Sequence, residues 1–325
     1  MLILSCVACG EREPFQEKAT GGFPEDHVIR VSTEVVPATK GSYTTDNITE
    51  FDLIVTDWTK NPAYSYTNTR FSKSASGEWV PDVTLLWGGA KDRVTVYAVA
   101  PCFKARDLKT NSFLRAPNNP DDLCEVEAEQ HEESKNSDYL YWVGSHDYNK
   151  LMVEECLADD GKLKIQFTHM LSLVRITFKL GTEFNNTEIP QSNIISDVVV
   201  SGTKRSFGIS STNYDDALAA VALPRTAASD VKPYNLDWTS AGDKTGNCTS
   251  VYECILVPQT VSAGELKISF KAGGKAYEWI APENLTFSIN KVHSLTLKVG
   301  KDVVIADGFT AAEWGDGGSA TSETE

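Results

Sequence analysis

The sequence predicts an all-β protein built from antiparallel β-sandwich domains, and three observations support this class. Apolar and polar residues alternate over many short runs, which is the period of strands with one buried face. Turns rich in Gly, Asn and Asp separate these runs. The helical patterns that an α/β sheet requires between its strands are absent. Because 325 residues exceed one typical core, we expect two domains.

The composition excludes several classes of function. The formal net charge is −15 and the isoelectric point is near 4.8, so the surface repels nucleic-acid backbones and anionic membrane surfaces. We therefore expect no nucleic-acid partner. No window reaches the roughly 18 to 20 apolar residues that a membrane-spanning helix needs.

Residues 1–26 are predicted to be the remnant of a lipoprotein signal followed by a tether. A small residue precedes Cys6, as in a bacterial lipobox, where the cysteine thiol carries the lipid; Cys9 is the second choice. The competing interpretation is a Cys-x-x-Cys redox or zinc pair, but no second pair follows at ligand spacing. Charged residues, Gly and Pro fill residues 10–26, as in a flexible linker.

The first domain is predicted to span residues 27–160. Its strands are expected at 28–35, 50–58, 64–71, 83–87, 93–100, 139–143 and 150–155. Pro37 and Pro101 close two of them, because proline cannot donate to a strand ladder.

Residues 104–138 differ from the rest of this domain. They are acidic and poor in apolar residues, so we expect a solvated excursion from the sheet that contains at most a short helix. A calcium site there would lack the EF-hand spacing. His131 begins an incomplete zincin motif, because Lys135 stands where the second histidine ligand belongs.

The second domain is predicted to span residues 161–316, before a polar tail at 317–325. The stretch 161–181 contains two strands that meet at a short knot, since its apolar residues follow period 2 rather than 3.6. Further strands are expected at 194–200, 251–257, 266–270, 275–280, 287–289, 294–299 and 303–306. Gly273-Gly274 marks a hairpin turn, and a helical turn is expected near 217–223.

Known patterns of catalysis are missing. No nucleophile elbow, P-loop, dinucleotide fingerprint or paired metal-ligand histidines occur, so we predict neither an enzyme nor a cofactor or metal site. His169 has no carboxylate nearby in the sequence, so we expect it to hydrogen-bond backbone at the domain junction rather than act as a general base. Trp79, Trp87 and Trp142 are predicted to pack in the core, while carbohydrate binding stays open.

The cysteines beyond the N-terminus do not describe a disulfide framework. Their number is odd and their spacing irregular, which favours buried free thiols, although Cys248 and Cys254 could pair across a turn. They are Cys102, Cys124, Cys156, Cys248 and Cys254.

Several segments resemble, in matching order, the motifs of one family. They are 167–177 (FTHMLSLVRIT), 252–262 (YECILVPQTVS), 290–297 (NKVHSLTL), 305–317 (IADGFTAAEWGDG) and 94–101 (VTVYAVAP). Over most of residues 27–317 the chain is thereby similar to the fimbrillin-like (Bacteroidetes type V pilin) family. Asn290 and His293 stand where the family pattern has Gly and Tyr.

The resemblance implies a fold, a location and a mode of assembly. The fold is two β-sandwich domains of transthyretin-like topology. The location is the cell surface, where a diacylglycerol and palmitate anchor holds the lipoprotein in the outer membrane. Fimbrial subunits of this kind assemble after an Arg- or Lys-specific protease removes the first strand, because a C-terminal segment of a neighbouring subunit then fills the groove.

For this chain the resemblance implies specific segments. Residues 27–36 would be the removable strand, cleavage would follow Lys40 or, as the alternative, Arg30, and the donor would lie within 303–314. Lys40 stands where Arg is usual, and the tail after Trp314 is short and acidic. A tip or accessory adhesin for adhesion and biofilm formation therefore competes with a stalk subunit. The alternative class is a monomeric surface lipoprotein that binds a glycan or a host protein.

Overall fold

In the computed structural model, structure is described for residues 22–36, 43–59, 63–102, 124–131, 137–145, 150–211, 218–222 and 227–314. Strands dominate these ranges, so the all-β class is confirmed. The α-helix α1 (Val153–Cys156) and the 3-10 helix η4 (Thr182–Asn185) are each a single turn long. No helix in the described ranges is long and apolar enough to cross a membrane.

The first half of the chain forms an eight-stranded sheet around its own core. In spatial order the strands are β1 (Val31–Val35), β9 (Leu163–His169), β7 (Leu140–Ser145), β5 (Arg93–Ala100), β2 (Glu50–Asp57), β3 (Tyr66–Lys73) and β4 (Trp79–Pro81), and β8 (Leu151–Met152) pairs with β5. Aromatic rings fill the centre of this core. Phe51 stacks on Phe71 with 5.1 Å between ring centroids and meets Phe167 edge-on.

The second half forms two larger sheets and a short ribbon. The five-stranded sheet has the order β14 (Tyr234–Thr239), β15 (Thr249–Leu256), β10 (Ser172–Leu180), β20 (Lys291–Val299) and β21 (Val304–Glu313). The three-stranded sheet consists of β11 (Ile195–Ser201), β17 (Lys267–Ala272) and β18 (Lys275–Ile280), and the ribbon of β16 (Gln259–Val261) and β19 (Leu285–Phe287). Side chains of both sheets, such as Ile176 and Phe270, share one buried core, as in a β-sandwich.

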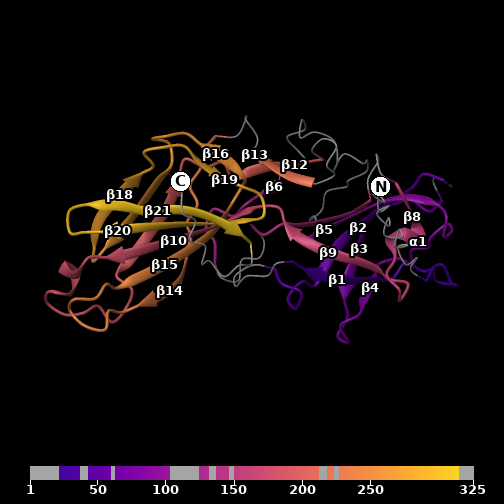
Figure 1. Ribbon diagram of the computed structural model, residues 1–325, viewed down its shortest axis with the longest axis horizontal. Helices are drawn as coiled ribbons and strands as arrows, with labels where there is room; N and C mark the ends of the chain where they lie inside the picture. Colours follow the sequence, from indigo (N-terminus) through magenta and orange to yellow (C-terminus); the bar gives the residue numbers. More distant parts are fainter. Residues whose placement is uncertain are drawn as a thin grey trace, which may run out of the picture.

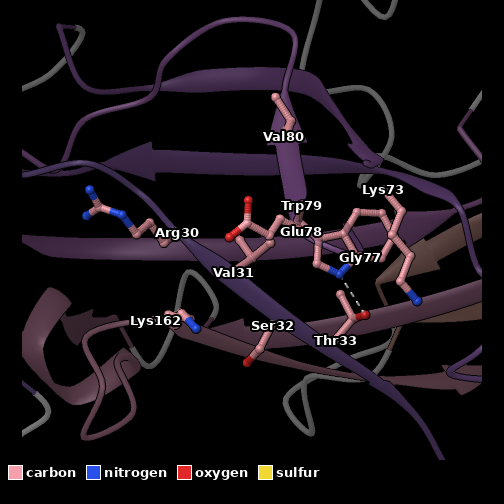
Figure 2. Close-up of a pocket in the computed structure, with 10 residues that line it drawn as sticks. All are labelled: Arg30, Val31, Ser32, Thr33, Lys73, Gly77, Glu78, Trp79, Val80 and Lys162. Atoms are coloured by element: carbon pink, nitrogen blue, oxygen red, sulfur yellow. Dashed lines mark hydrogen bonds between the residues drawn. The ribbon is translucent and has the colours of Figure 1, made fainter. Parts of the chain in front are cut away.

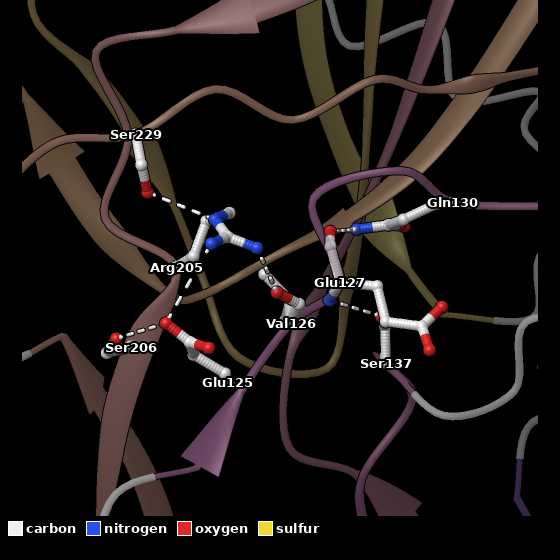
Figure 3. Close-up of polar contacts among 8 residues, drawn as sticks. All are labelled: Glu125, Val126, Glu127, Gln130, Ser137, Arg205, Ser206 and Ser229. Carbon is white, nitrogen blue, oxygen red and sulfur yellow. Dashed lines mark hydrogen bonds and ion pairs between the residues drawn. The ribbon is translucent and has the colours of Figure 1, made fainter.

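A small sheet joins the halves. It contains β13 (Leu218–Ala222), β12 (Ser206–Ser211) and β6 (Cys124–Glu125), and β6 comes from the first half of the sequence. In Figure 3, Arg205 beside β12 donates to the carbonyl of Val126 (3.0 Å) and lies 3.8 Å from the Glu125 carboxylate. Figure 1 shows this sheet between β1–β5 at one end of an elongated molecule and β10, β14, β15 and β20 at the other.

Gln130 adds a further link between the halves. Its amide Nε2 donates to the carbonyl of Ile255 (2.9 Å), and its Oε1 accepts from the N–H of the same residue (2.7 Å). The side chain thus takes the place of a neighbouring strand at the end of β15. A third buried cluster surrounds this link and draws side chains from both halves, among them Val99, Leu171 and Val292.

The chain crosses from one sheet to the other between β9 and β10. β9 pairs with β1 and β7, whereas β10 pairs with β15 and β20. The knot expected inside 161–181 is therefore the crossing point. The division into domains at residue 160 stays a prediction.

Two strand pairings are parallel rather than antiparallel. β1 runs parallel to β9, and β10 runs parallel to β20. The other strand pairs within the described ranges are antiparallel, as predicted. Parallel neighbours are joined by long connections, so no turn motif in the sequence reveals them.

Three local predictions were wrong. Residues 83–87 form no strand but an isolated β-bridge between Leu86 and Val28, and the strand of this region is the earlier β4. The strand predicted at 150–155 ends after β8, because the Glu155 carboxylate accepts from the Met152 N–H (2.7 Å) and caps α1. The helical turn near 217–223 is instead β13, which pairs with β12 over its full length.

The prediction of a solvated excursion was wrong for part of residues 124–131, where buried and exposed residues alternate. Cys124 and Val126 are buried in the cluster between the halves, and Gln130 is 4% exposed. Burial is tolerated because the polar groups of this segment are paired with β12, Arg205 and Ile255. Residues 103–123 and 132–136 lie outside the described ranges.

The predicted core cysteines and tryptophans are largely confirmed. Cys102, Cys124, Cys248 and Cys254 are buried free thiols, and Cys156 is a partly exposed one. Burial raises the pKa of the Cys102 and Cys254 thiols, which keeps them protonated at neutral pH. Trp87 is buried, and Trp79 and Trp142 pack partly buried against the first core.

The substitution Gln130→Leu tests the link between the halves. It removes both hydrogen bonds to Ile255 and leaves a buried N–H and a buried carbonyl unpaired. We expect the free energy of unfolding, measured in urea, to fall by about 2 to 4 kcal/mol. Gln191→Leu, which removes an exposed hydrogen bond to the Ile189 carbonyl, is the control and is expected to change it by about 0.5 kcal/mol or less. Equal unfolding midpoints for the two variants would contradict the link.

Candidate functional site

β1, the strand predicted to be removable, lies at the edge of the first sheet. Its five residues pair with β9, from Val31 opposite Leu163 to Val35 opposite Phe167. Just before β1, the Ile29 N–H donates to the Leu85 carbonyl (2.9 Å). The backbone of β1 itself is thus held by a strand ladder on one side only.

The inward face of β1 covers the first core. Ile29, Val31 and Val35 are 2%, 7% and 5% exposed and belong to the same buried cluster as the aromatic rings. Thr33 accepts a hydrogen bond from the Trp79 indole N–H (3.0 Å). Burial of the three apolar side chains contributes roughly 5 to 9 kcal/mol, so removal of β1 would leave an apolar groove that needs a new occupant.

A cavity of about 480 Å³ lies between β1 and the β3–β4 hairpin. Figure 2 shows Arg30 and Lys162 on one side, Lys73 on the other and Glu78 between them. The lining residues are Arg30, Val31, Ser32, Thr33, Lys73, Gly77, Glu78, Trp79, Val80 and Lys162. Its volume falls in the usual range of small-ligand sites, roughly 300 to 1,000 Å³.

Two of the basic side chains that line the cavity pair with carboxylates outside it. Arg30 donates to Asp26 (3.0 Å), and this hydrogen bond, more than any other contact, lowers the pKa of the Asp26 carboxyl to about 2. Lys162 lies 3.4 Å from the Asp160 carboxylate. The Lys73 ammonium instead donates to the Thr45 carbonyl (3.2 Å) and lies 5.8 Å from the centre of the Trp79 ring.

The structure describes one of the predicted processing residues. Arg30 is exposed, but its carbonyl accepts from the Leu163 N–H (2.8 Å), so cleavage there would require the sheet to open first. Lys40, the preferred cleavage site, lies outside the described residues, as do the predicted lipidation sites Cys6 and Cys9. Cleavage and lipidation stay predictions.

The predicted donor segment forms β21, the edge strand of the five-stranded sheet. It extends to Glu313, beyond the short strand expected at 303–306. Val303 and Ile305 are 54% and 56% exposed, and they border a hollow of about 300 Å³ beside Lys179 and Lys298. These two apolar side chains contribute little to their own core.

The other half of β21 is held by aromatic packing. A bulge shifts the register between Leu295 and Leu297, and after it Phe309 stacks on His293 with 5.5 Å between ring centroids. Burial lowers the pKa of His293 to about 4, so the ring is neutral at neutral pH. Its Nε2 accepts from the Ser288 N–H (2.9 Å).

His169 lies at the crossing point, as predicted, and the structure adds a carboxylate partner. Its Nδ1 is 2.9 Å from the Asp138 carboxylate, and both side chains are fully buried. The other Asp138 oxygen accepts from the Tyr43 N–H (2.8 Å). On its face, the His169 ring stacks on Trp314 with 4.0 Å between centroids. Asp138, 31 residues away in sequence, could not be assigned to His169 from spacing alone.

Burial and the charge of Asp138 raise the pKa of the Tyr43 phenol to about 12, with burial the larger cause. Within the described residues, no group of three or more His, Cys, Asp or Glu side chains is placed to hold a metal ion. At the crossing point, Asp138 links the His169 ring to the Tyr43 backbone. Gln130, Asp138 and Trp314 were not singled out by motif reasoning, although Trp314 lies in one of the segments that carry the resemblance.

Comparisons with known proteins extend these observations. The profile of a family described as fimbrillin-like matches residues 37–314. No curated protein matches the chain in sequence. Similar solved structures include a fimbrial protein from Bacteroides vulgatus, with 14% identity, a TM-score of 0.51 and coverage of 88% of this chain and 99% of that one.

Two further structures, described as candidate cell adhesion proteins, share the fold. The one from Bacteroides ovatus has 11% identity, a TM-score of 0.58 and coverage of 88% of this chain and 97% of that one. The one from Bacteroides uniformis has 13% identity, a TM-score of 0.56 and coverage of 90% and 99%. Because the family profile covers most of the sequence, the chain belongs to the fimbrillin-like family, a non-enzymatic class of fimbrial and adhesin-like proteins of the cell surface.

Proposed function

We propose that this protein is a fimbrial subunit or a tip or accessory adhesin that joins other subunits by protease-triggered strand exchange, in the service of surface adhesion and biofilm formation. One observation carries the proposal. Val31 and Val35 of β1, with the preceding Ile29, fill part of the first core, yet within the described residues the strand ladder of β1 is with β9 alone. A single cut in the segment after β1 would leave it without a covalent link to the rest of the sheet.

The physics of exchange supports the proposal. Once β1 has left, the edge of β9 has unpaired N–H and C=O groups beside a bare apolar groove, and an added strand satisfies both. The predicted donor segment 303–314 has a suitable pattern, because Val303 and Ile305 are exposed and two residues apart, as are the buried Ile29 and Val31 of the removable segment. Cleavage after Lys40, with Arg30 as the alternative, would begin the exchange.

We further propose that a lipid anchor on Cys6, or on Cys9, attaches the precursor to the outer membrane. Residues 10–26, charged and rich in Gly and Pro, would then be the tether to two sandwich domains at 27–160 and 161–316. The separate buried cores of the two halves support two domains, with residues 163–167 of β9 belonging to the first core.

Limited trypsin treatment of purified residues 10–325 tests the processing step. We expect a new N-terminus at Gly41 by mass spectrometry and an SDS-resistant ladder on an unheated denaturing gel, because an inserted strand is held by a full ladder of hydrogen bonds. Lys40→Ala is expected to abolish both, whereas Lys91→Ala, which removes an exposed lysine that pairs with Glu154, leaves both unchanged. A trimmed protein that stays monomeric would refute strand exchange.

Ile305→Asp tests the donor segment. Ile305 is 56% exposed in the monomer, so its stability should change little, but the same position would be buried after insertion into a neighbour. Because an unpaired buried carboxylate costs several kcal/mol, we expect at least about tenfold less ladder. Val83→Asp, at a position 59% exposed and outside β21, is the matched control. Equal ladders from the two variants would place the donor elsewhere.

The cavity beside β1 favours a second candidate function, that of a monomeric surface lipoprotein that binds a glycan. Arg30, Lys73 and Lys162 surround it with only Glu78 as an anion among its lining residues, in a chain of net charge −15. Trp79 and two hydroxyl side chains provide the apolar and hydrogen-bonding surfaces that sugars use. An acidic sugar is the ligand that fits a cavity with this excess of basic side chains beside apolar and hydroxyl surfaces.

Calorimetric titration with trigalacturonate tests this candidate, with neutral galactotriose as the control sugar. Binding of the acidic sugar alone is expected, and Lys73→Glu should weaken it about tenfold or more, since the variant reverses a charge at the cavity. Lys244→Glu changes a lysine outside the cavity by the same charge and should leave the affinity unchanged. A lack of heat with both sugars, or equal affinities of the two variants, would exclude this candidate.

A further inference from the structure

The C-terminal end of β21 is fixed at the crossing point between the halves. Trp314 directly follows the strand, is fully buried and stacks on His169 with the ring planes 5° apart. The Trp314 N–H also donates to the Asn290 carbonyl (3.3 Å), and the Asn290 N–H donates to the Leu171 carbonyl (3.0 Å). β21 therefore cannot separate from β20 over its whole length while Trp314 stays in this stack.

The same stack is joined to the segment that follows β1. Asp138 connects the two through its separate oxygens, one at the His169 ring and one at the Tyr43 N–H. Tyr43 is eight residues beyond the end of β1, and its side chain packs against the first core that β1 covers. Segments at opposite ends of the chain thus meet at one buried carboxylate.

Loss of the hydrogen bond from the Tyr43 N–H to Asp138 would weaken the contacts between Asp138, His169 and Trp314. Asp138 is fully buried, and a buried carboxylate is tolerated only with hydrogen-bond donors around it. Without the Tyr43 N–H, the buried Asp138 carboxylate has one hydrogen-bond donor fewer. A conformation in which the site opens and water reaches this carboxylate then becomes more favourable relative to the closed one. The opening would release the His169 ring and with it the surface on which Trp314 stacks.

We infer that Asp138, His169 and Trp314 form a lock that keeps β21 in its own sheet until the N-terminal segment has been displaced. The inference rests on the proposed strand exchange, for which it supplies the regulation. A cut after Lys40 leaves Tyr43 near the start of the trimmed chain, where loss of β1 uncovers the core against which its side chain packs and so weakens the hold of its N–H on Asp138. A subunit would therefore release its C-terminal strand only after its own N-terminal strand had gone. The coupling is reciprocal, so withdrawal of Trp314 would also loosen the segment at Tyr43.

Hydrogen–deuterium exchange of the full chain, read by mass spectrometry, tests the lock without cleavage. Tyr43→Pro removes the N–H that Asp138 accepts and leaves β1 in place; Tyr43→Phe keeps that N–H and removes the hydroxyl group. We expect about tenfold or faster exchange in β21 for the proline variant alone, with exchange in β17 and β18 unchanged. Asp138→Ala, which removes both contacts at once, is expected to show the same pattern.

Other outcomes would overturn the lock. These are an unchanged β21 in both Tyr43→Pro and Asp138→Ala, or an equal increase in every strand, which would mean general destabilisation. Glu253→Gln is the control, because it removes a buried carboxylate from the five-stranded sheet that contains β21. Glu253 pairs with Arg175 (2.9 Å) and not with β21. The ladder assay separates the two hypotheses. A ladder with no effect of Tyr43→Pro on β21 refutes the lock alone, whereas a faster β21 without any ladder refutes strand exchange alone.

Discussion

The fold depends on a chain crossing that is buried on all sides. His169, Met170, Leu171 and Ser172 are each 0% exposed, so the backbone passes from one half to the other without contact with water. Every polar group there needs a partner, and residues far along the chain supply them. The Met170 N–H donates to the Tyr139 carbonyl, and the Ser172 hydroxyl donates to the Ser288 carbonyl. This requirement draws segments of both halves to one place and explains why the third buried cluster forms there.

Both strands in the proposed exchange are edge strands, but they are held differently. β1 is secured mainly by its side chains, whose inward face lies in the first core. β21 has weak side-chain burial in its first half and is secured by the bulge-flanking Phe309 and by its C-terminal end. Departure of β1, which is held by buried side chains, would leave an apolar groove. β21 is held by Phe309 and by its C-terminal end, so its exposed apolar residues could be buried in another subunit. Edge position alone would not distinguish these two roles.

Much of the fold could be predicted from the sequence, because period-2 alternation is a local property. The strands around 93–100, 194–200, 251–257 and 275–280 all occur near their predicted places. Several features that could not be predicted depended on distant partners. The parallel partners of β10 and β1 and the burial of Gln130 are set by residues roughly 120 to 130 positions away, which no local pattern encodes. For the same reason His169 could be singled out as a junction residue while its carboxylate partner could not.

The parallel pairs also have a kinetic consequence. Ser172 of β10 lies opposite Lys291 of β20, roughly 120 residues later, and Val31 of β1 lies opposite Leu163, roughly 130 residues later. Closing such long loops is slow compared with forming hairpins, and the entropy of closure must be overcome before the contacts form. During synthesis the central strand β10 therefore stays without one of its neighbours until nearly the entire chain has been made. Both sheets can therefore be completed only after these long-range pairings form.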